Sequence, residues 1–297
     1  MQQFYGQIAA LLTSVCWSFN SIAFSIAGRI VGSPTVNHIR LWVALVVVSM
    51  IHLVVYQQIF PFNAGMDRLF WLATSGVVGF AIGDSFFFEA LVLIGPRLST
   101  LVMLLAPIFS AILGWIVLSE NLSIYQIIAI LLTTGGISWV VLEKGDNNAS
   151  AKSYSKGIAY GVGGAFCQAS GLLFSKLGLA DGFAPISANL IRLTAAAFTV
   201  GLAALFRGVM VSDVKKMKNK IAFIGIIVGA LLGPVSGVIL SLVAISYANI
   251  GIASTLMQLA PIILLPISHY YFKEKVSSRA IIGTVIAIAG ASLLFIL

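Results

Sequence analysis

Two acidic residues lie inside a long apolar stretch of this sequence, and they are the first candidates for chemistry. Asp84 and Glu89 belong to the run Gly-Asp-Ser-Phe-Phe-Phe-Glu. If this stretch crosses a membrane, each carboxylate costs about 3 kcal/mol even on permissive insertion scales, so it must face a cavity or a partner. We therefore expect Asp84 either to exchange a proton or to bind a cationic group of a substrate. A purely structural buried network is the alternative.

Two arginines in other apolar stretches could serve these acids. Arg40 is expected at a depth similar to that of Glu89, so we predict that these two pair and leave Asp84 as the less satisfied acid. Arg192 has no obvious acidic partner in its own half of the chain. It could pair with a substrate carboxylate or extend its charge to the membrane interface. An acid together with a free arginine would suit a zwitterion such as an amino acid.

Further polar side chains lie in the middle of apolar stretches and are candidates for the walls of a substrate pocket: Trp17, Asn20, Gln168 and Gln258. Amides inside a membrane need hydrogen-bond partners, which neighbouring helices supply as well as a ligand does. The two cysteines lie inside apolar runs, and they give neither a disulfide framework nor a metal site. We expect no catalytic residue, no metal and no cofactor.

The composition indicates the environment that must hold these residues. The chain has 297 residues, 60% of them apolar and 9% charged, and its mean hydropathy is +1.06. A soluble domain carries roughly a quarter charged residues, so this chain cannot build a surface that faces water. This excludes a soluble enzyme, a disordered regulator and a nucleic-acid binder, although the formal net charge is +8. The lipid bilayer is the expected surrounding.

Ten apolar runs have the length of about 20 residues that a helix needs to cross the hydrocarbon core. They lie near residues 5–27, 37–57, 69–93, 98–118, 123–142, 157–178, 186–206, 221–247, 252–272 and 277–296. The alternating segments of a transmembrane barrel do not occur. The sequence therefore predicts an all-α polytopic membrane protein with ten transmembrane helices.

The two halves of the chain repeat each other. A shift of 154 residues places Met103–Ile108 on Met257–Ile262. With a slip of two residues, Asn37–Leu41 falls on Asn189–Leu193. Each half contains five spans, an odd number, so the second half must enter the membrane in the opposite orientation. The fold is predicted as two inverted five-helix repeats, an arrangement typical of secondary transporters.

The bounds of the two repeats follow from a polar stretch near the middle of the chain. We predict the first repeat at residues 1–143 and the second at 157–297, with a polar linker loop at 144–156. A single chain contains both halves, so either a monomer or a homodimer is compatible with this organisation.

Each half carries an Ala-Pro-Ile helix, a glutamate at its end and a glycine in its last helix. The marks are Ala106–Pro107 with Glu120 and Ala260–Pro261 with Glu274. With ten spans in two halves, the sequence resembles the EamA-type transporters of the drug/metabolite transporter superfamily over its full length. The resemblance implies export of a small metabolite or amino acid, often in exchange for protons. We expect the two glutamates to cap the spans that follow them.

We therefore expect a secondary active transporter that moves a small-molecule substrate by alternating access, with efflux as the expected direction. One alternative is an importer of a vitamin, nucleobase or sugar. Another, from a different class, is a membrane-embedded enzyme that modifies lipids. The sequence has no G-x-x-x-x-G-K-[ST] pattern, so ATP-driven pumping is not expected.

Basic residues gather in the loops of one side of the predicted membrane. The positive-inside rule makes this side cytoplasmic. The sequence thus predicts a multi-pass protein of the cytoplasmic membrane with both termini outside, whereas relatives in the resembled family are usually drawn with both termini inside.

Overall fold

The structure is a computed structural model that describes residues 2–141, 151–260, 262–263 and 278–296. Its elements in chain order are α1 (Gln2–Val31), α2 (Ser33–Tyr56), α3 (Met66–Gly76), η1 (Val77–Gly83), α4 (Asp84–Met103), α5 (Leu105–Leu118), α6 (Ile124–Val141), α7 (Ala151–Gly178), η2 (Ala180–Gly182), α8 (Pro185–Phe206), α9 (Met210–Lys216), α10 (Lys220–Ala230), η3 (Leu231–Gly237), α11 (Val238–Tyr247), α12 (Ile250–Met257) and α14 (Ser278–Ile296). Much of the ninth predicted span, and Glu274 after it, lie outside the described residues.

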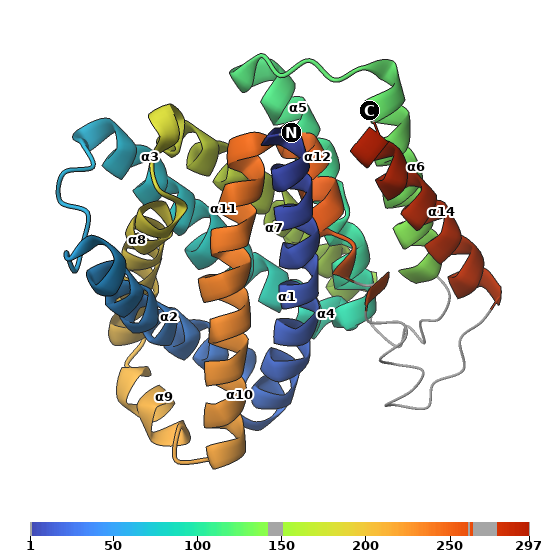
Figure 1. Cartoon of the computed structure of the whole chain (residues 1–297). Coiled ribbons are helices and arrows are strands. Elements are labelled where there is room, and N and C mark those ends of the chain that lie inside the picture. The colour runs from blue at the N-terminus through green and yellow to red at the C-terminus, as the bar shows by residue number, and fades with distance from the viewer. Residues whose placement is uncertain (1, 142–150, 261, 264–277, 297) are drawn as a thin grey trace.

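Six described helical stretches are long and apolar enough to cross a membrane, and three shorter apolar helices accompany them. Apolar runs become helices here because a bilayer offers no hydrogen bonds, so each segment must satisfy its own backbone groups. The prediction of an all-α polytopic membrane protein built from two repeated halves is confirmed. The start of α1 and the end of α14 lie at the same end of the bundle, opposite α9 (Figure 1).

The helices of one half pack against the helices of the other. α1 packs along α10, η3 and α11, and its repeat mate α7 packs in the same way along α3, η1 and α4. α2 lies against α8, α5 against α12, and α6 against α14 (Figure 1). The contacts between the halves therefore follow the symmetry of the repeat, and the core is formed between the halves.

Two of the membrane-crossing stretches contain a π-helical segment at equivalent positions of the repeat. A shift of 154 residues places η1 (Val77–Gly83) on η3 (Leu231–Gly237). π-helical turns are rare and occur frequently at functional sites. Proline accounts for only one of them, because Pro234 lies inside η3 whereas η1 has none. Asp84 is the first residue after η1.

Some helix ends differ from the predicted boundaries. α4 continues through Gly95–Arg97, where a turn is predicted, and ends at Met103. The segment between the predicted spans 186–206 and 221–247 contains a short helix, α9. At the start of α6 the backbone N–H of Ser123 donates to Gln126 at 3.0 Å, and that of Gln126 donates to Ser123 at 3.2 Å, which is a capping box.

Glycines allow α6 and α14 to touch at their backbones. A Cβ on Gly136 would lie 2.5 Å from the amide nitrogen of Ala287, and a Cβ on its repeat mate Gly290 would lie 2.7 Å from the amide nitrogen of Thr133. Close approach of this kind replaces the hydrophobic driving force that is missing inside lipid. The pair α6–α14 is thus held by backbone contact at two equivalent glycines.

Replacing Gly136 with alanine is expected to destabilise the protein by about 2 kcal/mol, because the added methyl group overpacks a backbone contact. The neighbouring Gly135 has open space within 4 Å of its Cβ position, so Gly135→Ala serves as the matched control and should be neutral or slightly stabilising. Thermal unfolding in detergent measures both. Equal melting temperatures for the two variants would contradict the described packing.

Candidate functional site

Asp84 lies at the junction of η1 and α4, where a buried arginine from α2 meets it. Arg40 donates a hydrogen bond from Nη2 to Oδ2 of Asp84. Asn37, one turn earlier in α2, accepts hydrogen bonds from Nε and Nη2 of Arg40 at 3.0 and 2.9 Å. The rings of Phe24 and Phe88 lie 5.4 and 5.5 Å from the guanidinium. Arg40 is therefore fixed by an amide, a carboxylate and two aromatic rings.

The predicted pairing of Arg40 with Glu89 is wrong. Glu89 is exposed on α4, and Arg40 pairs with Asp84 instead. Five residues turn an α-helix by about 140° beyond a full turn, so the two acids point in different directions and only Asp84 reaches α2. Asp84 is thus the paired acid of the site.

Asp84 is also the accessible member of its ion pair. Its side chain is 29% exposed, compared with 8% for Arg40. A carboxylate at this depth in a membrane needs its partner. Part of the surface of Asp84 is not covered by protein, whereas Arg40 is enclosed.

Arg192, the repeat mate of Arg40, enters the same region from α8. It is 4% exposed, so it lies inside the bundle and not at the interface. Its guanidinium lies over the ring of Phe80 in η1, 4.5 Å from the ring centre, and its charge attracts Asp84. Within the described part of the chain, Nε and Nη1 of Arg192 are buried without a hydrogen-bond partner.

Small residues of the first half let α8 come this close. A Cβ on Gly76 would collide with the backbone carbonyl of Arg192, and a Cβ on Gly79 would lie 3.6 Å from its Nη2. Because only glycine fits at Gly76, the first half determines where the arginine of the second half lies.

Two further predicted site residues come from α1 and meet the second π-helical segment. Trp17 places its Nε1 2.8 Å from the Cβ position of Gly237. The amide of Asn20 lies directly against Gly233. Both side chains therefore border η3, whereas Asp84 and Arg192 border η1.

The two predicted glutamines are more distant from the charges. Gln168 lies on α7, which packs along η1 and α4. Gln258 forms the C-cap of α12, near Ala260, whose carbonyl accepts a hydrogen bond from Ser18 of α1 at 3.1 Å. Both amides are partly exposed. None of the described hydrogen bonds or ion pairs joins them to Asp84 or to the arginines.

At the end of the bundle that holds the termini, a partly buried ion pair connects the two halves. Glu120 pairs with Lys176 of α7 and accepts a hydrogen bond from the backbone N–H of Ile250 at 2.9 Å. Lys176 also donates to the carbonyl of Ala248 at 2.8 Å. The prediction that Glu120 caps the following span is therefore wrong, because Glu120 caps the start of α12 instead. Glu274 lies outside the described residues.

At the opposite end, a buried aspartate of α9 is held by the start of α2. Asp213 accepts hydrogen bonds from Thr35 at 2.7 Å, from Nδ1 of His38 at 3.0 Å and from Lys216 at 3.4 Å. Burial raises the pKa of Asp213, but these hydrogen bonds outweigh it and hold the pKa below its ordinary value. Sequence reasoning missed this cluster because 178 residues separate Thr35 from Asp213 and no local pattern links them.

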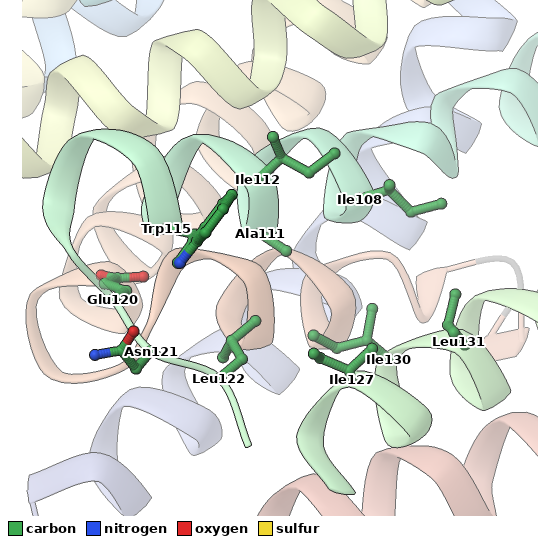
Figure 2. Close-up of a pocket in the computed structure, with 10 residues that line it drawn as sticks. All are labelled: Ile108, Ala111, Ile112, Trp115, Glu120, Asn121, Leu122, Ile127, Ile130 and Leu131. Atoms are coloured by element: carbon green, nitrogen blue, oxygen red, sulfur yellow. The ribbon is translucent and has the colours of Figure 1, made fainter. Parts of the chain in front are cut away.

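Two cavities lie away from the charged cluster. One of about 320 Å³ separates α5 from α6 (Figure 2). Its walls are apolar, with Trp115 and Leu131 among them, and Glu120 and Asn121 mark its one polar end. The other, of about 140 Å³, is bordered by His52 of α2 and residues near the start of α8. Neither is lined by the predicted site residues, so the candidate site rests on the charged cluster itself.

The charged cluster can bind a charged group. Asp84 accepts a hydrogen bond from Arg40 and lies near Arg192, whose Nε and Nη1 have no hydrogen-bond partner in the described chain. No group of three His, Cys, Asp or Glu residues that could hold a metal ion occurs among the described residues. An accessible acid between two arginines at a contact between repeated halves is suited to binding and releasing a small charged solute or a proton.

Comparison with known proteins agrees with this description. The model of the EamA-like transporter family matches residues 4–142 and again residues 155–296. An uncharacterized transporter of Haemophilus influenzae is 26% identical over 164 residues, which are 55% of this chain and 53% of that protein. The chain thus spans about half the length of the curated relative it matches. One crystal structure shares the fold, with a TM-score of 0.73 at 15% identity, over 97% of this chain and 95% of the other.

The pair of Arg40 and Asp84 should show strong energetic coupling. Arg40→Met and Asp84→Leu are each expected to destabilise the protein by about 3 kcal/mol, because each leaves an uncompensated charge in the bundle. The double variant should lose much less than the sum of these values. Unfolding in detergent measures the cycle, and Glu89→Leu, at an exposed acid, is the control. Additive losses would show that the pair is not formed.

The depressed pKa of Asp213 predicts a pH-dependent contribution to stability. Asp213→Asn should lower the melting temperature at pH 7, where the carboxylate is ionised and accepts charge-assisted hydrogen bonds worth about 2 kcal/mol. A lowered pKa means that this stability is present above the ordinary pKa of about 4 and is lost as the pH falls through the lower folded value. The difference from wild type should therefore shrink below pH ~4. Asp181→Asn, at an exposed residue whose ion pair with Arg68 is open to solvent, should show a much smaller difference at either pH.

Proposed function

We propose that this chain, which belongs to the EamA-like transporter family, is a secondary active transporter that carries a small metabolite, such as an amino acid, by alternating access. Membership of the family and the multi-pass helical fold make it a membrane transporter. The substrate, the coupling ion, the direction and the membrane are the parts that we propose.

The accessible ion pair of Asp84 with Arg40 supports this function most directly. Asp84 begins α4 next to the contact between the halves, where α2 and η1 of the first half meet α8 of the second. In an inverted-repeat carrier, movement of one half against the other exposes such a site to each side in turn. A group that both halves contact therefore senses the transition.

We propose that Asp84 exchanges the Arg40 partner for a proton or for a cationic group of the solute. In the unloaded carrier the carboxylate is compensated by Arg40. A proton that arrives from the outside neutralises Asp84 and weakens this attraction. When the site faces the cytoplasm, the proton leaves and Asp84 is again an anion. Outward movement of the solute in exchange for inward movement of protons is the cycle that we propose.

The two repeats, residues 1–143 and 157–297, are the units that we propose to move against each other. The links at the two ends are compatible with this movement. Glu120 and Lys176 join the two halves at the end that holds the termini. At the other end, the two halves are joined by the hydrogen bond between Thr35 and Asp213. In alternating access, these links would open in turn. One chain supplies both halves, so a monomer is sufficient and a homodimer remains compatible.

We propose the cytoplasmic membrane as the location, with both termini outside. α9 and the segment that follows it carry four lysines, and they lie opposite the two termini (Figure 1). The positive-inside rule assigns the lysine-rich end to the cytoplasm. Labelling of cysteines introduced near Gln2 and near Lys218 in intact cells tests this orientation.

The central prediction concerns Asp84. In proteoliposomes loaded with mixed amino acids and small metabolites, a pH gradient should drive release of one class of solute from the wild-type protein. Asp84→Asn should lose at least nine tenths of this gradient-driven flux, because the amide cannot take up or release the proton. Mass spectrometry of the external medium measures the release.

Glu89→Gln is the matched control, since it removes an exposed acid of the same helix and should leave the flux unchanged. Equal release from wild type and Asp84→Asn would agree with the proposed transport but would refute the proposed role of Asp84. Accumulation inside the vesicles, instead of release, would favour the importer. A chemically altered lipid with no solute flux would favour the membrane-embedded enzyme.

A further inference from the structure

We infer that Arg192 binds the anionic end of the solute, and that the transported solute therefore carries a carboxylate. This inference rests on the proposed transport function and deepens it by naming the substrate class. It starts from the donors of Arg192, which have no acceptor among the described residues, although the side chain is only 4% exposed.

The free donors lie on both edges of the guanidinium. Nε belongs to one donor edge of an arginine and Nη1 to the other, and both atoms are buried without a partner in the described part of the chain. The Cζ atom of the guanidinium lies over the Phe80 ring, 4.5 Å from the ring centre. This contact holds the guanidinium beside η1, while Nε and Nη1 have no acceptor among the described residues, and a planar acceptor is what these two edges of an arginine bind best.

Arg40, the repeat mate of Arg192, is an arginine of the same fold whose donors are used by the protein itself. Asn37 accepts hydrogen bonds from Nε and Nη2 of Arg40. The equivalent residue Asn189 is directed elsewhere, because it donates to the carbonyl of Pro234 at 2.8 Å and its own Oδ1 has no partner in the described chain. The second half thus contains the same Asn-x-x-Arg motif without the contact that occupies the arginine.

A buried guanidinium without acceptors is unfavourable, since desolvation is not repaid by hydrogen bonds. Contact with Phe80 and attraction to Asp84 compensate only part of this cost. A carboxylate of the solute would supply two oxygens in the geometry that a guanidinium edge matches best. A phosphate ester would bring up to two negative charges close to Asp84, so the nearby acid favours the carboxylate.

The transport test compares solutes that differ only in this group. Proteoliposomes receive α-amino acids together with the corresponding α-amino acid amides, which keep the ammonium group and replace the carboxylate with a neutral carboxamide. Wild type should move the acids at least tenfold faster than the amides, since a site built for an anion rejects a ligand that leaves its donors unpaired. Arg192→Gln should abolish this preference, and Arg192→Lys should restore part of it.

Arg207→Gln, at an exposed arginine just after α8, is the control and should keep the preference. Equal rates for acids and amides in wild type would overturn the inference and leave the transporter intact. Faster transport of phosphate esters than of amino acids would also overturn it. Absence of any flux from wild type would refute the proposed substrate class as well as the inference.

A stability measurement separates binding from a structural role. Arg192→Met should not lower the melting temperature, because it removes an unsatisfied charge, whereas Arg40→Met should lower it. Acetate, as the simplest carboxylate, should raise the melting temperature of wild type but not of Arg192→Met. A fall for Arg192→Met as large as that for Arg40→Met, or the same acetate effect in both proteins, would show that Arg192 is structural.

Discussion

The structure depends on one constraint, which is that a charge inside a bilayer must be compensated by another group of the protein. Asp84 and Arg40 satisfy this constraint together, and Asn37 and two aromatic rings complete the surroundings of the arginine. The helices that supply these groups cannot separate far without exposing a charge to lipid. The pair therefore connects the position of α2 to that of η1 and α4, and any change in the charge of Asp84 alters this connection.

The two halves share their scaffold but not their charges. The shift of 154 residues that places η1 on η3 also places Asp84 on Val238, so the acid occurs in one half only. Both halves retain the arginine, but only the first half supplies a carboxylate to pair with it. A symmetric fold thus contains an asymmetric site, which has one satisfied cation, one unsatisfied cation and a single acid between them. The repeated sequence accounts for the symmetric fold. The presence of an acid in one half only makes the charges of the site asymmetric.

The sequence predicts the fold well because a helix that crosses lipid must be apolar along its length and because the two halves visibly repeat each other. The helical nature of the apolar runs, the repeat, and the need of Asp84 and Arg40 for partners inside the bundle are all evident from residue types and spacing. Their partnership is not, because depth along a span says nothing about the direction in which a side chain points; for this reason the sequence predicts Glu89, at a similar depth, as the partner of Arg40, whereas the structure pairs Arg40 with Asp84. The π-helical segment before Asp84 contains no proline, so its sequence does not predict the irregular turn. Contacts such as that of Thr35 with Asp213 cannot be predicted from the sequence for a different reason. They join segments that are distant in the chain through single polar atoms.

The two ends of the bundle are held together by different chemistry, and this difference bears on how the halves can move. At the end that holds the termini, the carboxylate of Glu120 and the ammonium of Lys176 are partly buried and each also bonds one backbone group. Separating them exposes two charges at once, so water or solute must replace each partner as the contact opens. At the other end, one carboxylate of Asp213 receives hydrogen bonds from a hydroxyl, an imidazole and an exposed ammonium. Because this second link is divided among three donors, the loss of one hydrogen bond leaves the other two in place.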